Sequence, residues 1–274
     1  MTLLGATGLT KAYRSHSLVG ASAPRTVVQN VSLSIGAGET VALLGRSGCG
    51  KSTLARLLVG LERPTAGEVA YRGKPLKALG RSEHIDFRRN VQLVFQDSPG
   101  AVNARFTIRA IVAEPLRHLT SLDEHAREAR VQELLAMVDL PAGIAGMLPS
   151  QVSGGQLQRV CIARALAVDP KLVILDEAVS NLDIHLQASA VALLARLQKE
   201  GGIAYLFVTH DLRLVRRFAS RCLVMDDGRI VEECDGAALD NMRHPASRLL
   251  SAAVLPPLPM PRKRPAPDGL CSNS

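Results

Sequence analysis

Four short runs of apolar residues along the chain predict buried β-strands. Their Val, Leu and Ile residues are continuous, as parallel strands covered on both faces require. Between them lie segments in which apolar residues recur every three or four positions, as in STLARLLVGL at 52–61 and at 184–200, and these predict helices. This alternation predicts an α/β domain. The four runs are TVALL at 40–44, VQLVF at 91–95, LVILD at 172–176 and YLFVT at 205–209.

Two further stretches predict antiparallel strands. Residues 11–45 are rich in Val, Ser and Thr and contain turn signals, which favours antiparallel strands beside the main sheet. Residues 222–234 predict a hairpin that turns at Asp227–Gly228.

The middle and the end of the chain follow other patterns. Residues 98–160 contain the helical pattern SLDEHAREARVQELLAMVDL and few strand candidates, so we predict a helical subdomain inserted into a domain that spans residues 1–250. Residues 251–274 are rich in proline and basic, and predict a disordered tail. We expect the RKR run at 262–264 to be solvated, and contact with acidic lipid is the alternative.

Glycine or polar residues follow each of the four predicted strands. Ligands of open α/β sheets gather at the carboxyl ends of the strands, so these residues predict one shared site. They are Gly45 after the first strand, Gln96 and Asp97 after the second, Asp176 and Glu177 at the third, and Thr209 and His210 at the fourth.

The loop after the first strand has the pattern of a phosphate-binding loop. GRSGCGKST at 45–53 matches G-x-x-x-x-G-K-[ST] between a strand and a helix. We expect Lys51 to reach the β- and γ-phosphates and the Ser52 hydroxyl to bind Mg²⁺, so ATP and Mg²⁺ are the expected cofactors. Cys49 is a candidate for alkylation or simply a small filler. The expected nucleotide-binding residues here are Gly45, Arg46, Ser47, Gly48, Cys49, Gly50, Lys51, Ser52 and Thr53.

The other strand ends supply candidate catalytic groups. Asp176 can hold Mg²⁺ directly or through water, and Glu177 lies one position further toward the γ-phosphate, where a carboxylate orients or deprotonates water. A polar strand end is the weaker alternative for this pair. Gln96 is expected to bind Mg²⁺ or the attacking water, or else only ends its strand. His210 is a candidate γ-phosphate contact, although a lone histidine is usually structural.

Tyr13 is one of only three tyrosines and lies at the beginning of the β-rich stretch. An aromatic ring there can stack on adenine, an interaction that contributes about 1–3 kcal/mol by analogy with base stacking. A core or surface aromatic is the alternative.

A second glycine loop, VSGGQ at 152–156, precedes a helix that we predict to begin near Leu157. The N–H groups and dipole of such a helix suit a γ-phosphate. Because one chain already has a phosphate loop, we expect this one to act on ATP bound to another molecule, in a head-to-tail pair that hydrolyses ATP when closed. The residues are Ser153, Gly154, Gly155 and Gln156.

Composition narrows the possible functions. The net charge of +8 suits a polyanionic partner, but no dense basic run precedes residue 262 and only 3% of residues are aromatic, which argues against a base-stacking surface. We expect no signal peptide and no membrane-spanning segment. The five scattered cysteines suit a reducing compartment, and no metal site apart from that for Mg²⁺ is expected.

Over about residues 3–250 the chain resembles the ATP-binding cassette (ABC) family. The resemblance implies an ATPase with a P-loop NTPase (RecA-like) core, an antiparallel β subdomain and an inserted α-helical subdomain that carries the signature loop. The matching parts, in family order, are Tyr13 as the adenine-stacking aromatic, 45–53 as Walker A, Gln96 as the Q-loop glutamine, 152–156 as the signature with Val for Leu, 172–176 as Walker B with Glu177 as the catalytic base, SNLD at 180–183 as the D-loop with Asp183, and His210 as the switch histidine.

Finer resemblance is to the dipeptide, oligopeptide and nickel importer branch, through RHPASRLLSAAVLP at 243–256. DEAVSNLD at 176–183 departs from the branch's usual DEPTSALD and is similar to the nickel importers. The resemblance implies a peripheral subunit on the cytoplasmic face of a bacterial inner membrane. Its expected partners are a second, homologous but different ATPase, two permease subunits and a periplasmic nickel-binding protein. The residues themselves do not choose nickel over a peptide, because an ATPase subunit does not touch the cargo.

Two other classes of function are open alternatives. A soluble cassette ATPase acting on nucleic acid or ribosomes usually has a long coiled-coil insertion or two fused cassettes, and this chain shows neither. A non-enzymatic regulator is disfavoured because Lys51, Gln96, Asp176, Glu177 and His210 are all present.

Overall fold

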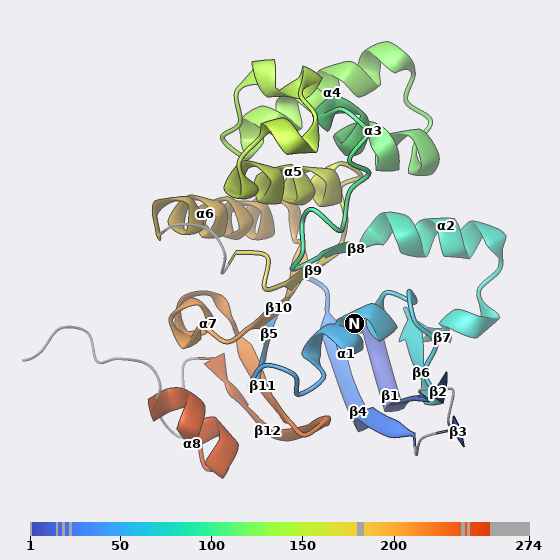
Figure 1. The fold of residues 1–274 in the computed structure, drawn as a ribbon, viewed down its shortest axis with the longest axis vertical. Helices are drawn as coiled ribbons and strands as arrows, with labels where there is room; N and C mark the ends of the chain where they lie inside the picture. Colours follow the sequence, from blue (N-terminus) through green and yellow to red (C-terminus); the bar gives the residue numbers. More distant parts are fainter. Residues whose placement is uncertain are drawn as a thin grey trace, which may run out of the picture.

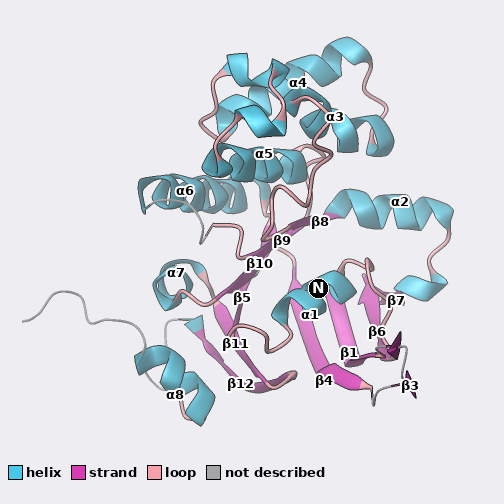
Figure 2. Ribbon diagram, viewed as in Figure 1, coloured by secondary structure: helices cyan, strands magenta, loops and turns pink. Residues whose placement is uncertain are grey.

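The structure is a computed structural model that describes residues 2–14, 16–17, 20–21, 24–179, 184–236, 239 and 242–252. Its centre is a six-stranded sheet in the order β12-β11-β5-β10-β9-β8, shown in Figures 1 and 2. All neighbours are parallel except β12, which forms an antiparallel hairpin with β11. The bounds are β5 Thr40–Leu44, β8 Val91–Val94, β9 Leu172–Asp176, β10 Ala204–Thr209, β11 Arg221–Asp226 and β12 Arg229–Asp235.

The four apolar runs are confirmed as neighbouring parallel strands, and their composition follows from burial on both faces. In β9, for example, Leu172 and Ile174 pack on one side of the sheet, and Val173 and Leu175 pack on the other. Burying one such side chain contributes about 1.5–3 kcal/mol, which favours apolar residues along β9 until Asp176 at its carboxyl end. Strand β8 is less buried and has a polar residue, Gln92, at its second position.

A second, antiparallel sheet in the order β4-β1-β6-β7 lies beside the first. The prediction of antiparallel strands there is confirmed, although β1 begins well before Lys11. Helix α1 and this sheet share one apolar cluster with a face of the main sheet. The bounds are β1 Thr2–Tyr13, β4 Arg25–Gly36, β6 Ala66–Tyr71, β7 Lys74–Pro75 and a short separate pair, β2 His16–Ser17 with β3 Gly20–Ala21.

The helical subdomain lies over one end of the main sheet, at the top of Figure 1. Its helices share a single apolar cluster that continues onto β8, β9 and β10. They are α3 Ile108–Leu119, α4 Glu124–Met137 and α5 Gly154–Leu166, with short 3₁₀ segments at 142–146 and 149–151.

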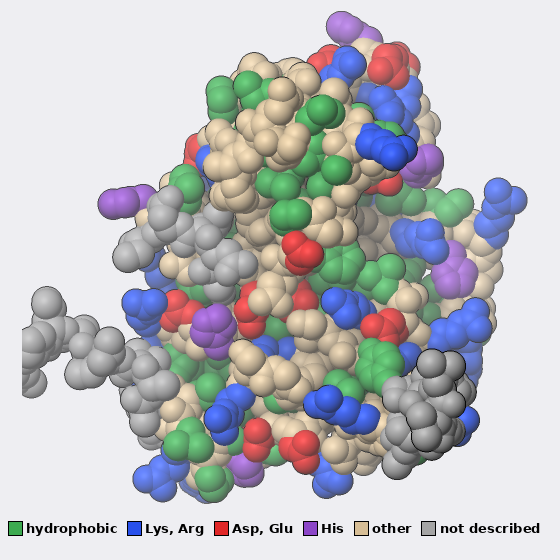
Figure 3. All heavy atoms as spheres, viewed as in Figure 1, with side chains coloured by type: hydrophobic (Ala, Val, Ile, Leu, Met, Phe, Trp, Pro, Cys, Tyr) green, Lys and Arg blue, Asp and Glu red, His purple; other side chains and the backbone are tan. Residues whose placement is uncertain are grey.

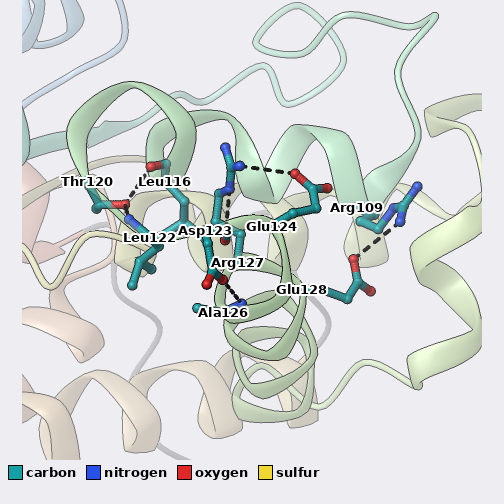
Figure 4. Close-up of polar contacts among 9 residues, drawn as sticks. All are labelled: Arg109, Leu116, Thr120, Leu122, Asp123, Glu124, Ala126, Arg127 and Glu128. Atoms are coloured by element: carbon teal, nitrogen blue, oxygen red, sulfur yellow. Dashed lines mark hydrogen bonds and ion pairs between the residues drawn. The ribbon is translucent and has the colours of Figure 1, made fainter.

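The connection between α3 and α4 shows why these helices end and begin where they do (Figure 4). The Thr120 hydroxyl donates to the Leu116 carbonyl at the end of α3, and Asp123 caps α4 by accepting from the Ala126 N–H at 2.8 Å. Such a cap contributes about 1 kcal/mol.

The remaining helices cover the sheets. Between β6 and β8, α2 follows a 3₁₀ segment at 76–78, while α6, α7 and α8 belong to the C-terminal part of the chain. Among the described residues, no helix combines the length and hydrophobicity needed to cross a membrane. The predicted D-loop residue Asp183 and nearly all of the predicted tail lie outside the described residues. The bounds are α1 Lys51–Leu58, α2 Arg81–Asn90, α6 Ile184–Gly201, α7 Leu212–Phe218 and α8 Pro245–Ala252.

Candidate nucleotide-binding and hydrolysis site

The loop between β5 and α1 is built to expose backbone N–H groups. Gly48 and Gly50 have φ values of +80° and +109°, which residues with a Cβ atom rarely adopt. Helix α1 begins at Lys51 without a side-chain cap and without an acidic residue in its first turn. The first N–H groups and the positive end of the helix dipole are therefore available to an anion.

The turn of the β11–β12 hairpin packs directly on this loop. Asp227 and Gly228 both have positive φ values, as a two-residue hairpin turn requires, and the Gly228 N–H donates to the Cys49 carbonyl at 3.0 Å. A Cβ atom on Gly45 would lie 2.4 Å from the Met225 carbonyl oxygen. The predicted hairpin is confirmed, and the structure adds that it supports the phosphate loop.

Cys49 fills the space between the loop and the hairpin. Its side chain is buried in the same apolar cluster as α1, and burial raises the pKa of its thiol. A buried thiol with a raised pKa is a poor nucleophile, so the structure favours the role of a small filler over reactivity toward alkylating agents.

Lys51, Ser52 and Asp176 come together beneath the loop. Lys51 is only 5% exposed, and its ammonium donates to the carbonyls of Gly45 and Arg46 at 2.7 and 3.0 Å. The Ser52 hydroxyl donates to Asp176 Oδ1 at 3.0 Å. Burial, followed by the charge of Glu177, raises the pKa of Asp176 against the opposing hydrogen bond from Ser52. A hydroxyl and a buried carboxylate at this separation are a donor set that fits Mg²⁺.

Glu177 is positioned by its neighbours on both sides. It has a φ of +49°, rare for a residue other than glycine, and its N–H donates to the Val208 carbonyl at 2.9 Å. The Gln96 amide donates to Glu177 Oε2 at 2.8 Å, and His210 Nδ1 lies 3.5 Å from Oε1. The structure thus brings three of the predicted strand-end residues into one contact group.

A hollow of about 220 Å³ lies over the loop and opens to solvent. Several residues that were predicted for the site do not line this hollow, although some of them contact residues that do: Gly45, Arg46, Cys49, Asp176, His210 and Tyr13. Val27 of β4 lines it and was missed, because a valine in a strand gives no local signal. The lining residues are Val27, Ser47, Gly48, Gly50, Lys51, Ser52, Thr53, Gln96 and Glu177.

Tyr13 ends β1 beside the hollow. The residue is 39% exposed and its hydroxyl donates to Glu62 Oε2 at 2.5 Å. Burial and Glu62 raise the pKa of this hydroxyl, and the nearby Thr53 side chain, which lines the hollow, opposes the shift. The ring is therefore close to the loop, and part of its surface is open.

The second glycine loop begins α5, and the predicted start of this helix near Leu157 is wrong. The helix begins at Gly154, because Ser153 and Gln156 form a capping box in which each side chain accepts from the other's backbone N–H, at 3.2 and 2.8 Å. Ser153 and Gly154 are exposed. None of the four signature residues lines the hollow over the phosphate loop.

Helix α5 is tied to the segment that follows Gln96. The Ser98 hydroxyl donates to the Gln158 side chain, and both residues are buried. Arg164 donates to the Ala101 carbonyl at 2.7 Å. The helix that carries the signature loop is thus connected to the strand end that contacts Glu177.

These features define a P-loop nucleotide-binding domain with an inserted helical subdomain. The family model described as ABC transporter matches residues 28–180, more than half of the chain. The chain therefore belongs to the ABC transporter family.

Relatives and solved structures agree with this assignment. The chain is 74% identical over 260 residues to the nickel import ATP-binding protein NikE of Brucella suis biovar 1, covering 95% of this chain and 98% of the relative. It is 54% identical over 263 residues to the Escherichia coli K12 protein of that name, covering 96% and 98%. Among solved structures it is similar to the ATP-binding cassette MJ0796, a dimer bound to ADP and Pi (TM-score 0.77, 32% identity, 85% and 98% covered). It is also similar to cbiO1 of Clostridium perfringens, part of the transporter complex cbiONQ (TM-score 0.70, 26% identity, 87% and 90% covered).

Proposed function

We propose that this chain is the ATP-hydrolysing subunit of a bacterial ABC importer for nickel, peripheral on the cytoplasmic face of the inner membrane. The observation that carries the proposal is the meeting of Lys51, Ser52 and the contact group of Glu177 at one edge of the parallel sheet. The cargo comes from the 74% identical relative, whose name states nickel import.

In this proposal the loop and Lys51 bind the phosphates, and Tyr13 stacks on adenine. Ser52 and Asp176, with Gln96, would hold Mg²⁺, which neutralises phosphate charge when bound. Glu177 accepts the proton of the attacking water or orients it, an effect typically of 10²–10⁴-fold on the rate. Gln96 and His210 hold the Glu177 carboxylate in place through the 2.8 and 3.5 Å contacts, with His210 also facing the γ-phosphate.

The signature residues Ser153–Gln156 act on ATP held by a second ATPase subunit, in a head-to-tail pair. The exposure of Ser153 and Gly154, and the absence of all four residues from the hollow of their own chain, support this arrangement. The related cassette MJ0796 forms a dimer. We propose that the partner here is a homologous but different chain, and that Asp183 takes part in the contact.

Two permease subunits and a periplasmic binding protein complete the proposed complex. A second hollow of about 460 Å³ lies beside the Gln96–Ala101 segment. Phe106, just before α3, and Met147, whose carbonyl accepts from the first N–H of α3, expose 46% and 42% of their surface. A permease segment bound there would lie next to the residue that contacts Glu177. On the face shown in Figure 3, Lys and Arg side chains are interspersed with Asp and Glu, which does not favour nucleic acid as the partner.

Uptake of labelled nickel tests the proposal. Cells that lack other nickel importers are supplied with this chain and its partner subunits, and nickel-63 accumulation is compared with that of labelled dipeptide. We expect nickel uptake, reduced at least a hundredfold by Glu177→Gln. Glu68→Gln, which changes an exposed carboxylate paired with Lys77, is the control and should leave uptake unchanged.

The arms of this experiment separate the two parts of the proposal. Dipeptide uptake in place of nickel would show that the cargo is wrong while the ATPase assignment stands. Wild-type uptake by Glu177→Gln would show that Glu177 is not the catalytic base.

A further inference from the structure

Tyr13 is held in place by a carboxylate from a different part of the chain. Its hydroxyl donates to Glu62 at 2.5 Å, and 49 residues separate the two in sequence. Glu62 belongs to the connection between α1 and β6 and has a side chain only 22% exposed. A short hydrogen bond from a phenol to a carboxylate is of the stronger, charge-assisted kind.

Two basic side chains fix Glu62 in turn. Lys11 Nζ lies 3.3 Å from Glu62 Oε2, and Arg56 Nη1 lies 3.9 Å from Oε1. The Lys11 ammonium also donates to the Arg63 carbonyl at 2.9 Å. Because Glu62 is shared by three partners, its carboxylate has little freedom to turn away from Tyr13.

The same cluster leaves part of the tyrosine ring open. The Lys11 ammonium lies over the ring, 5.1 Å from its centroid, which is a cation–π geometry. A ring has two faces, and the 39% exposure of Tyr13 shows that its surface is not fully covered. Lys11 lies over one face only, so the other face is the one that the proposal assigns to adenine.

Glu62 also connects the ring to the helix of the phosphate loop. Arg56 is in the last turn of α1, and the backbone N–H of Glu62 donates to the Arg56 carbonyl at 3.3 Å. Toward the other end of α1, the Thr53 side chain lies near enough to the Tyr13 hydroxyl to influence it. The position of the ring is thus set relative to the helix that begins with Lys51 and Ser52.

We infer that Glu62 is a positioning residue for nucleotide binding, which holds Tyr13 at a fixed distance from the phosphate loop. The inference rests on the proposed function, in which Tyr13 contacts adenine. The base and the phosphates belong to one molecule, so both contacts form together only when ring and loop are correctly spaced. A ring fixed in advance avoids the entropy that ordering it during binding would cost.

Competition with a fluorescent ATP analogue on the purified chain tests this inference, using ATP and inorganic tripolyphosphate as competitors. Tripolyphosphate contacts only the loop. We expect Tyr13→Phe and Glu62→Ala each to lower the affinity for ATP about three- to tenfold and to leave the affinity for tripolyphosphate unchanged. The double variant should bind ATP as tightly as the single variant with the lower affinity, because both changes remove the same hydrogen bond. Tyr13→Ala should weaken ATP about 5- to 150-fold through loss of the stack.

The chain supplies a matched control in Tyr71, whose hydroxyl donates to Asp86 at 2.9 Å with Arg72 over its ring. Tyr71→Phe should change the affinity for neither ATP nor tripolyphosphate.

An equal loss of affinity for ATP and tripolyphosphate in Glu62→Ala would show a general structural role and overturn the inference. The inference would also be overturned if Tyr13→Phe and Glu62→Ala bound ATP with wild-type affinity while Tyr13→Ala bound it more weakly. Unchanged affinity in Tyr13→Ala would instead overturn the adenine contact of the proposed function.

Discussion

At the scale of single residues, Asp176, the proposed Mg²⁺ ligand, carries a cost in stability. Its carboxylate is 3% exposed, and burial is the main cause of its raised pKa. A raised pKa means that the folded chain binds a proton more tightly than the unfolded chain does. The stability that this group contributes is therefore complete below its unfolded pKa and is lost as the pH rises through its folded pKa.

Because the pKa of Asp176 is raised by folding, we predict that Asp176→Asn stabilises the nucleotide-free chain at neutral pH. The amide keeps the shape of the carboxyl group and removes the buried charge. We expect its melting temperature at pH 7.5 to exceed that of the wild type by about 2–4 °C, the shift that roughly 1 kcal/mol produces in a domain of this size. The difference should shrink toward low pH, where wild-type Asp176 is protonated.

Thermal unfolding across pH measures this effect, with Asp169→Asn as the control. Asp169 is 78% exposed and pairs with Arg130 at 2.6 Å, so its change should not raise the melting temperature at any pH. With ATP and Mg²⁺ present, the order of wild type and Asp176→Asn should reverse, because ligand binding stabilises the wild type more. A lower melting temperature of nucleotide-free Asp176→Asn at pH 7.5 would contradict the argument.

At the scale of elements, what could be predicted followed from local composition. The strand at 40–44 was predicted with its observed bounds because burial on both faces favours a continuous run of mainly apolar, β-branched and aliphatic residues. The start of α5 was misplaced because two glycines favour a loop, and only the capping box between Ser153 and Gln156 makes them helical. The contacts of Glu62 with Tyr13 and of Ser98 with Gln158 could not be predicted, since 49 and 60 residues separate the partners.

The contact between the β11–β12 turn and the phosphate loop is also non-local, and it gives a prediction for Gly228→Ala. A Cβ atom at this residue would lie 2.6 Å from the Val27 carbonyl oxygen, and its φ is +76°. The turn must then move, and the hydrogen bond from its N–H to Cys49 moves with it. We expect ATP affinity to fall about tenfold, which corresponds to roughly 1.4 kcal/mol.

Gly73→Ala is the matched control for this prediction. Gly73 also has a positive φ, +82°, but a Cβ atom there would meet nothing within 4 Å. Both variants should lose about 1 kcal/mol of stability from backbone strain. Only Gly228→Ala should also weaken ATP binding in a titration, and equal affinities in the two variants would show that the hairpin does not support the loop.

At the scale of the whole molecule, the two glycine loops lie apart, and the proposed function assigns them to different sites. The first loop lines a hollow together with Gln96 and Glu177, and the second is exposed on α5. The Ser98–Gln158 and Arg164–Ala101 bonds connect them through the segment after Gln96. If the proposed function is correct, this connection is a physical means of relating the chain's own ATP to the loop that acts on the partner's ATP.

Gly154→Asp separates action on the partner's ATP from action on the chain's own. A Cβ atom at Gly154 would meet nothing within 4 Å, and a carboxylate in the first turn of α5 interacts favourably with the helix dipole, so the chain should fold normally. The same carboxylate would repel a γ-phosphate brought to this loop. We therefore expect the purified chain to keep its ATP affinity within twofold, while the assembled complex loses at least a hundredfold in ATP turnover.

Gly143→Asp is the matched control. It adds the same charge to the same subdomain at an equally open residue and should change neither the ATP affinity nor the ATP turnover. If Gly154→Asp instead weakened ATP binding by the chain alone, the signature loop would act on the nucleotide of its own chain.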